Sequence, residues 1–466
     1  MMWHSRAVAL GGLLCTALAA CSVGPVYQRP NIAPPLEWRD APRAADAPAP
    51  VWPESNWWHA LGSPQLDDLI AEAERSNDDL AGAIARVREA DAQVRIAGAP
   101  LFPTLDLSAD AARERVQVSG AGPRVINSFS PQITARYELD FWGKNRALRN
   151  AARAAALASR FDRETVALTV VSSVANTYFQ ALEYRDRIQV AQQNLQNGEK
   201  ILHGLELEQS AGTATGLDVA QQATAVALLE AALPPLRQQF RQSVYALAVL
   251  IGKTPESIDV TAGSLTDLSS PAVVAGLPSE LLSRRPDVAE AEQQLIAANA
   301  NITAARAALF PNIALTASGG YASSMLTSLI SPANRVYALS GGLTQPIFHG
   351  GALHAQVTYS EARYTELLTT YHKTVLTAFG DVESALVAVR QTADHEARQR
   401  DAVAKARRAY DFAQAQRSAG TVNILTVLNT ENALFSAQDT MIQAQYSHLV
   451  ALIDLFTALG GGWHQG

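Results

Sequence analysis

The chain is poor in cysteine and in positive charge, and each shortage excludes a class of protein. Both cysteines, Cys15 and Cys21, lie near the amino terminus, so no disulfide framework and no cysteine metal cluster can form further along. Acidic residues outnumber basic ones by 44 to 37, and this net charge of −7 provides no driving force for binding nucleic acid. The chain is 48% apolar and 17% charged, which is enough apolar side chain to fold.

Sequence motifs of catalysis and of cofactor binding are also missing. No nucleophile elbow is present, and no glycine-rich phosphate loop follows a predicted strand. His349 and His354 are five residues apart, but no cysteine or carboxylate stands beside them. Four methionines are too few to favour a dedicated copper or silver path, since these ions prefer soft ligands. We therefore predict no enzyme activity, no cofactor and no metal site.

Beyond residue 21 no apolar run reaches the length that a membrane-spanning helix needs, so no such helix is predicted. Residues 1–20 have the layout of a secretory signal, with Arg6, an apolar stretch and small residues at the end. Removing Arg6 changes the net charge from −7 to −8. The string Leu-Ala-Ala-Cys at 18–21 resembles a bacterial lipobox, in which the cysteine, here Cys21, becomes the lipid-carrying first residue. Ordinary cleavage after the small triplet 17–19 is the alternative, and Ser22 favours delivery to the outer membrane.

The second half of the chain repeats the first. An offset of 208 between the two halves aligns 101–109 (LFPTLDLSA) with 309–317 (LFPNIALTA). The same shift pairs Leu217 with Leu425 and Gly252 with Gly460, among other matches. One offset that holds over about 170 residues indicates two copies of one structural unit.

Each copy predicts the same order of elements: helix, strand, strand, long helix, turn, helix. Residues 64–99 and 287–308 are rich in helix formers and stop just before Leu-Phe-Pro. Residues 143–211 and 350–419 contain no proline, and at 1.5 Å per residue each predicts a helix of about 100 Å. Apolar residues at spacings of three and four give these helices one buried face, which is typical of a coiled coil or a tunnel wall.

The repeats divide the chain into six segments. Pro234-Pro235 has no counterpart in the second copy and predicts a kink or a break there. The segments are a signal peptide 1–20, a lipidated segment 21–63, repeat one 64–252 with a β-hairpin near 103–142 and a turn near 211–219, a proline-rich connector 253–286, repeat two 287–460 with a hairpin near 311–348 and a turn near 419–429, and a tail 461–466.

Four segments alternate apolar and polar residues with period two, as β-strands with two different faces do. Strands of about ten residues, separated by Gly-, Pro- and Ser-containing turns at 119–131 and 319–335, fit transmembrane strands, while a soluble hairpin packed on helices has the same alternation. Four strands cannot close a useful barrel, so several chains must share one if the strands span a membrane. The polar side chains expected to line such a lumen are Asp106, Asp110, Gln132, Thr134, Arg136, Glu138 and Asp140.

Several motifs together resemble the outer-membrane factor (TolC-like) family of Gram-negative efflux systems, in its RND-type lipoprotein branch. The motifs lie along the mature chain at 21–30 (CSVGPVYQRP), 57–58 (WW), 139–143 (LDFWG), 276–287 (GLPSELLSRRPD) and 348–351 (FHGG). The resemblance implies an α+β membrane protein that forms a homotrimer. Three times four strands make a 12-stranded transmembrane β-barrel, continued by a long α-helical tunnel through the periplasm.

The resemblance also implies partners and a function. The tunnel would meet a periplasmic adaptor, the membrane fusion protein, and through it an inner-membrane RND-type transporter. The chain would be lipid-anchored in the outer membrane and act as a passive export duct for small molecules such as drugs and toxic compounds. An outer-membrane duct for type I protein secretion, and a non-channel lipid-anchored coiled-coil scaffold, are the alternatives.

In that family the turn of each repeat forms the periplasmic tip, which is closed at rest and opens on docking. Gly212 and Gly420 permit the tight turns that end the long helices. Leu425 matches an apolar constriction that could exclude water, and a plain core leucine is the alternative. Asn429 stands where relatives often carry Asp, so the resemblance to an acidic ring does not extend to this position. Asp218 could supply negative charge in repeat one, or it could cap the following helix.

Overall fold

Long helices dominate the structure, a computed structural model that describes residues 23–39, 52–118, 122–261, 263–271 and 275–463. Helices α4 and α8 have 67 residues each, and α5 and α9 have 35 each. The bounds in chain order are α2 Pro64–Ser76, α3 Asp78–Gly98, β1 Thr104–Val118, β2 Gly122–Leu139, α4 Lys144–Ser210, α5 Gly216–Leu250, α6 Pro278–Leu281, α7 Pro286–Ala307, β3 Asn312–Tyr321, β4 Arg335–Thr344, α8 Ala352–Ser418 and α9 Ile424–Ala458. The predicted fold class is confirmed.

The two repeats agree residue for residue in their long helices. Adding 208 to the bounds of α4 and α5 gives the bounds of α8 and α9. The same offset separates the start of α3 from that of α7, and the start of β1 from that of β3. The offset found in the sequence is therefore a structural repeat.

Two compact units divide the chain, and each takes segments from both repeats. The first comprises residues 1–31, 85–160 and 290–373, and it contains all four strands. The second comprises residues 32–84, 161–289 and 374–466, and it contains α2, α5, α6 and α9 together with the turns that follow α4 and α8.

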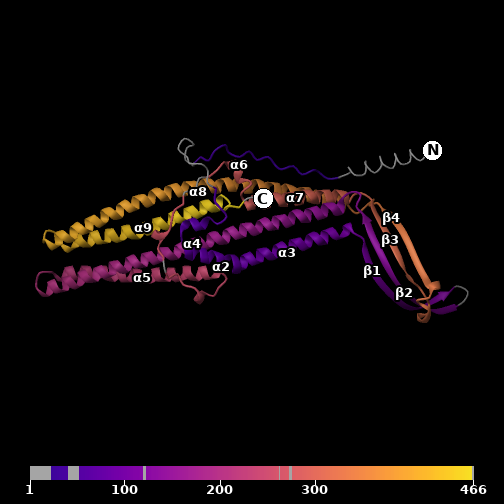
Figure 1. The fold of residues 1–466 in the computed structure, drawn as a ribbon, viewed down its shortest axis with the longest axis horizontal. Coiled ribbons are helices and arrows are strands. Elements are labelled where there is room, and N and C mark those ends of the chain that lie inside the picture. The colour runs from indigo at the N-terminus through magenta and orange to yellow at the C-terminus, as the bar shows by residue number, and fades with distance from the viewer. Residues whose placement is uncertain (1–22, 40–51, 119–121, 262, 272–274, 464–466) are drawn as a thin grey trace. The chain divides into compact units, whose positions relative to one another are not determined.

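The strands form one antiparallel sheet in the order β1-β2-β3-β4, seen as neighbouring ribbons in Figure 1. The pairing of β1 with β2 runs from Thr104 opposite Arg136 out to the start of β2 at Gly122. The predicted turn at 119–131 is wrong over residues 122–131, which belong to β2. Val125 and Phe129 favour a strand there, and this preference outweighs the Gly, Pro and Ser content of the segment.

Asp140 is not a strand residue, contrary to prediction, because β2 ends at Leu139. Its carboxylate accepts hydrogen bonds from the backbone nitrogens of Asn145 and Arg146, each at 2.9 Å, and from Nε of Arg146 at 3.2 Å. An acidic group at this place satisfies free N–H groups at the start of a helix and complements its dipole. Asp140 therefore caps helix α4 and is not one of the side chains of strand β2.

The core of the second unit surrounds helix α4. Its fully buried residues Tyr178, Phe179 and Leu182 pack with apolar side chains of α2, α5 and α9. Trp57 stacks on Phe456 with ring centroids 4.7 Å apart. Burying large side chains of this kind stabilises the fold by about 1.5–3 kcal/mol each. The predicted helical patterning of 143–211 thus serves a packed core in this unit.

The connector between the repeats contains only short helical turns in its described residues. These are η3 Pro255–Ser257, η4 Leu265–Asp267 and α6. Asp186 of α4 accepts hydrogen bonds from Ser264 Oγ and from the backbone nitrogen of Leu265, each at 2.9 Å. Side-chain bonds to α4 therefore replace regular secondary structure in holding this segment.

Helix α5 continues through Pro234 and Pro235, so of the predicted kink or break the break is wrong and the kink stays a prediction. Prolines inside a helix remove backbone hydrogen bonds to the preceding turn. The turn that loses them here includes Glu230 and Ala231, which are exposed, so water can bond their carbonyl groups. Leu233 beside the prolines is buried and holds the helix in its packing.

Candidate functional site

The sheet has two chemically different faces. The register places even-numbered residues of all four strands on one face and odd-numbered residues on the other. The even-numbered side, here called the polar face, carries every acidic side chain of the strands. These are Asp106, Asp110, Glu114 and Glu138. Arg136 lies 4.0 Å from Asp106 on this face, and Glu138 pairs with Lys144 at 2.6 Å. The predicted Gln132 and Thr134 share it.

The odd-numbered side, here called the apolar face, is built from aliphatic and aromatic residues over most of its length. Leu105, Leu107, Leu339 and Leu343 are all at least two-thirds exposed in one chain. Tyr337 is 91% exposed. A continuous apolar surface of this kind belongs against another apolar phase, either protein or lipid.

Glycine ends both long helices at the turns. Gly212 and Gly420 have φ of 78° and 73°, the left-handed conformation that glycine adopts without strain. In each turn the glycine N–H bonds the carbonyl three residues back, and the next N–H bonds the carbonyl five residues back. This is the Schellman arrangement, which satisfies the last free carbonyls of a helix. The two turns are thus built alike.

The helices that follow the turns are capped differently. In repeat one, Thr215 and Asp218 form a capping box, with Thr215 N and Oγ1 donating to Asp218 at 2.9 and 2.7 Å. These hydrogen bonds to Thr215 hold the pKa of Asp218 below its usual range. In repeat two, Asn423 Oδ1 accepts from Thr426 N at 3.1 Å, without any charge. Asp218 therefore caps α5, and its counterpart is neutral.

Leu425 lies on the first turn of α9 and is 45% exposed, while its neighbours Ile424 and Val427 are buried. Asn429 stands one turn later and is exposed as well. Spacing of four residues puts the two side chains on the same side of the helix. In one chain Leu425 is therefore no core leucine, and it is free to meet another surface.

A small cluster underlies the turns. Leu205 of α4 packs with Tyr410 of α8 and with Leu428 and Leu434 of α9. Arg417 bonds Glu208 at 2.6 Å, joining α8 to α4. Glu431 is buried beside this cluster, one of its oxygens has no hydrogen-bond partner, and burial raises its pKa to about 7.

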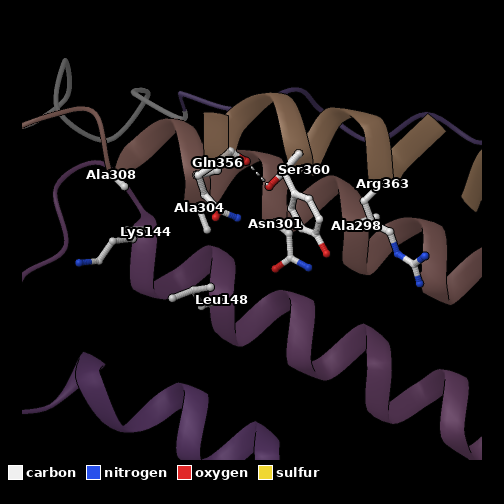
Figure 2. Close-up of a pocket in the computed structure, with 11 residues that line it drawn as sticks. Lys144, Leu148, Ala298, Asn301, Ala304, Ala308, Gln356, Ser360 and Arg363 are labelled. Atoms are coloured by element: carbon white, nitrogen blue, oxygen red, sulfur yellow. Dashed lines mark hydrogen bonds between the residues drawn. The ribbon is translucent and has the colours of Figure 1, made fainter. Parts of the chain in front are cut away.

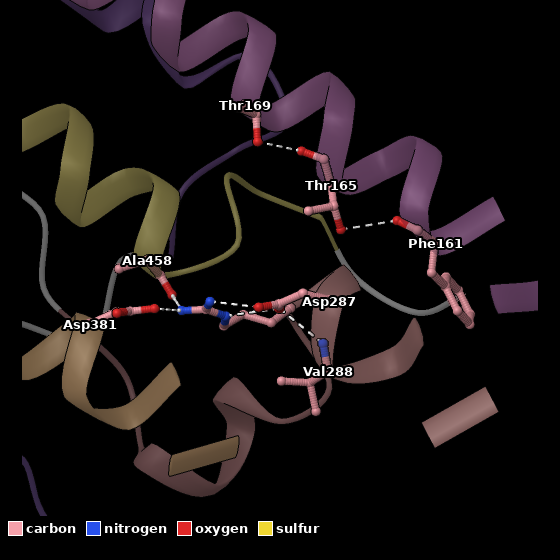
Figure 3. A network of polar contacts seen from close by, with 8 residues as sticks. Phe161, Thr165, Thr169, Asp287, Val288, Asp381 and Ala458 are labelled. Carbon is pink, nitrogen blue, oxygen red and sulfur yellow. Dashed lines mark hydrogen bonds and ion pairs between the residues drawn. The ribbon is translucent and has the colours of Figure 1, made fainter. Parts of the chain in front are cut away.

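Arg285 ties three segments of repeat two together, and Figure 3 shows the residues that it bonds, Asp287, Asp381 and Ala458. Its guanidinium bonds both oxygens of Asp287 at 2.7 and 3.0 Å, and Asp381 of α8 at 2.9 Å. It also donates to the carbonyl of Ala458, the last residue of α9, at 3.3 Å. A cation at a helix carboxyl end is favoured by the helix dipole. The start of α7, the middle of α8 and the end of α9 are thus fixed to one another.

A cavity of about 470 Å³ lies between α4, α7 and α8 in the first unit (Figure 2). Alanines of α7 line one side, Lys144 and Arg363 add positive charge, and Ser360 Oγ donates to the Gln356 carbonyl at 2.9 Å. Among the described residues that line this cavity none is a carboxylate. No group of three His, Cys, Asp or Glu suited to a metal occurs in the described ranges either.

Within the part of the chain that the structure describes, no helix is both long and apolar enough to cross a membrane. A four-stranded sheet with one polar and one apolar face, joined to paired helices of 67 and 35 residues, defines the class of channels that combine a β-barrel with an α-helical tunnel. Comparison with known proteins narrows this class to a family.

The sequence model of the outer membrane efflux protein family matches residues 69–253 and 277–461, two stretches related by the same offset as the repeats. The pyoverdine export outer membrane protein OpmQ of Pseudomonas putida is 40% identical over 97% of this chain and 96% of its own length. The probable efflux pump outer membrane protein TtgC of the same species is 34% identical, over 96% and 94%. A solved structure of CusC has a TM-score of 0.85 at 30% identity and covers 95% of this chain and 100% of that one.

The chain belongs to the outer membrane efflux protein family. It is the outer-membrane channel of a tripartite efflux pump, forms trimers and works with a periplasmic adaptor and an inner-membrane RND pump. It spans the outer membrane and extends into the periplasm. This supports the predicted duct over the scaffold. Cys21 lies outside the described residues.

Several structurally important residues were not found from the sequence. Glu431 looks like any helical surface acid, and only the packing around it shows its burial. Arg285 lies in the motif at 276–287, but nothing in the sequence places Asp381 beside it. Gly252 and Gly460 did carry a signal, because the same offset pairs them.

Proposed function

We propose that the polar face lines the lumen of the shared barrel and that the duct is passive, with no catalytic step. The segregation of all four acidic strand side chains on one face supports this orientation. Asp106, Asp110, Arg136 and Glu138 would then meet water and cargo. A wet, charged wall suits polar solutes, and the protein's part is to provide the path.

The cargo we propose is a class of small organic molecules that includes siderophores. The OpmQ proteins, 40% identical to this chain over nearly their full length, are named for pyoverdine export. Relatives at 34% and 33% identity are named for efflux of antibiotics and of toluene. A polar duct without a built binding site fits cargo of varied structure.

We further propose that the trimer is closed at its tip by three copies of Leu425. The observation that carries this proposal is the exposure of Leu425 between buried neighbours at the first turn of α9. Apolar side chains that meet around a narrow passage exclude water and so block ions. Asn429, one helical turn further, gives this passage a polar but uncharged second ring.

The test is conductance of the purified trimer in planar bilayers. Leu425→Ser should raise the mean conductance at least tenfold, because a hydroxyl ring holds water. Leu217→Ser is the matched control at the equivalent position of repeat one, where Leu217 is 66% exposed, and it should change conductance less than twofold. Equal conductance of both variants and the parent would overturn the gate, and no channel activity in any of them would overturn the duct.

Asn429→Asp provides a second arm of the same experiment. Three added carboxylates should make the current sensitive to block by a multivalent cation, which the parent resists. Unchanged block would place Asn429 away from the passage.

We propose that Cys21 is the lipid-carrying first residue of the mature chain. The segment that follows it packs on α7 in the unit that holds the sheet. Asn299 donates to the Pro25 carbonyl at 3.0 Å, and Arg29 pairs with Glu292 at 3.0 Å. Intact mass measurement should show acyl chains that Cys21→Ser removes.

A further inference from the structure

Three arginines interrupt the apolar face of the sheet. Arg113 and Arg115 of β1 and Arg335 of β4 are odd-numbered strand residues, and all three are exposed. The odd-numbered residues of the four described strands include no acidic side chain. The ion pair that joins two strands, Arg136 with Asp106, lies on the polar face. Among the described strand residues, the apolar face therefore carries three positive charges and no negative one.

The apolar band on this face has the height of a bilayer core. On β2 it runs from Leu139 to Phe129, ten residues apart, or about 34 Å along the strand at 3.4 Å per residue. A tilt of about 40° reduces this to about 26 Å, which matches the apolar band of about 25 Å in outer-membrane barrels. Aromatic rings lie near both ends as well as within the band: Phe129, which bridges to Ser323 two residues beyond Tyr321, is at one end, and the stacked Trp142 and Phe310 are just past the other.

Arg113 and Arg115 lie just past the outer end of this band. Arg113 is opposite Asn127, two residues beyond Phe129 and so about 7 Å further along the strand, and Arg115 is two residues further again. Arginine within the hydrocarbon costs about 2–4 kcal/mol, falling to about 0–1 at the interface. The two side chains therefore lie at headgroup level, where phosphates are available to pair with them.

Arg335 stands at the rim of a hollow on the same face. The hollow has a volume of about 500 Å³, and its lining includes Leu107, Ile133, Gly319, Tyr321 and Tyr337. Among the described residues of the lining, Arg335 alone is charged. A side chain on Gly319 would meet nothing within 4 Å, so this glycine leaves the hollow open. An apolar hollow with a cation at its edge fits an acyl chain attached to a phosphorylated headgroup.

We propose that Arg113, Arg115 and Arg335 bind phosphorylated lipid of the outer leaflet, with an acyl chain in the hollow over Gly319. This site rests on the proposed function, because it requires the apolar face to meet lipid and the polar face to line the lumen. It holds each chain's long hairpin against the membrane surface through ion pairs.

The experiment uses the full trimer in detergent and measures lipid bound per trimer by native mass spectrometry. The probes are bis-phosphorylated lipid A and the same lipid with both phosphates removed. The parent should bind the phosphorylated lipid at least tenfold more tightly. The triple variant R113Q/R115Q/R335Q should bind both lipids equally, and Gly319→Leu, which fills the hollow without changing charge, should weaken both.

Arg124→Gln is the matched control, because Arg124 pairs opposite Val116 in the same hairpin but lies on the polar face. It should leave lipid binding unchanged. No preference for the phosphorylated lipid, or the same preference in the triple variant, would overturn the site. Loss of binding in Arg124→Gln alone would show that the faces are reversed and overturn the proposed lumen as well. Bilayer conductance should be unchanged in the triple variant, which shows that the channel itself is intact.

Discussion

The two repeats have the same backbone but different side chains at their joints. In repeat two, Arg285 bonds Asp287, Asp381 and the Ala458 carbonyl that ends α9. At the equivalent position of repeat one, Asn77 donates to the Leu250 carbonyl that ends α5, at 2.8 Å. A neutral amide thus does in one copy what a paired cation does in the other.

Other joints did not diverge. Gly252 and Gly460 follow α5 and α9 with φ of 67° and 90°. A Cβ on Gly252 would lie 2.1 Å from the carbonyl oxygen of Ser76, and one on Gly460 would lie 1.9 Å from that of Arg284. Only glycine fits such an approach of two backbones. Close contacts between two backbones thus keep the same residue in both copies, while contacts between side chains are free to change.

The largest effect should come from breaking what the repeats share. Gly252→Ala and Gly460→Ala combine a left-handed backbone with a clash against a carbonyl, and each should lower the free energy of unfolding by about 4 kcal/mol. Denaturant midpoints of the purified trimer would measure this.

The matched control for the glycines is Gly420→Ala. Its φ is 73°, but a Cβ there would meet nothing within 4 Å. Its free energy of unfolding should fall by only about 1 kcal/mol, the cost of a left-handed backbone conformation for a residue with a Cβ. Similar losses at Gly420 and Gly460 would contradict the close-approach explanation.

The second prediction separates the repeats at Arg285 and Asn77. Arg285→Ala leaves the carboxylates of Asp287 and Asp381 without their cation. Because the Arg285 side chain is only 12% exposed, the free energy of unfolding should fall by about 3 kcal/mol. Asn77→Ala removes two neutral hydrogen bonds and should lose about 1 kcal/mol. Denaturant midpoints of the purified trimer would measure both losses of unfolding free energy. Equal losses at Asn77 and Arg285 would contradict the view that the neutral and the charged contact differ in strength.

The third prediction concerns pH and belongs to repeat two alone, because Ala223 occupies the position equivalent to Glu431. The folded pKa of Glu431, about 7, lies above its unfolded value of 4.5. The neutral form is therefore favoured on folding, and stability is present at low pH and lost as pH rises from about 4.5 to about 7. The loss between pH 5.5 and 8 should be about 2 kcal/mol.

Glu431→Gln should remove this part of the pH dependence, because glutamine has no proton to lose. Stability profiles of parent and variant from pH 5 to 8 would show it. Parallel profiles would mean that Glu431 is hydrated in the trimer.

The smallest effect is expected at the caps. Thr215→Ala and Asn423→Ala each remove a helix cap, and each should lower the free energy of unfolding by about 1 kcal/mol. Repeat one alone depends on a charge, so the loss of stability in Asp218→Asn should be larger at low salt than at high salt. Thermal midpoints at two salt concentrations would measure this, and Thr426→Val is the uncharged comparison in repeat two.

Much of this architecture could be predicted from the sequence because it rests on repetition and periodicity. The offset of 208 and the absence of proline in 143–211 predicted the long helices nearly to the residue. Alternation predicted the two faces of the sheet. Asp140 was misplaced because a cap and a strand end look alike in sequence. Glu431 was missed because its burial depends on packing that the local sequence does not show, and Arg285 was missed because Asp381 lies on a distant helix.

The equal lengths of the helices have a consequence for symmetry. Each chain carries two hairpins built from 67 and 35 residues, so a trimer presents six tips of equal reach. The backbones of the six tips are built alike, while the residue pairs Asp218 and Thr426, and Ala223 and Glu431, differ between the two hairpins of each chain and so recur only three times in a trimer. A partner that grips backbone and helix ridges can therefore use six places, whereas a change in charge or in gating acts at every second one.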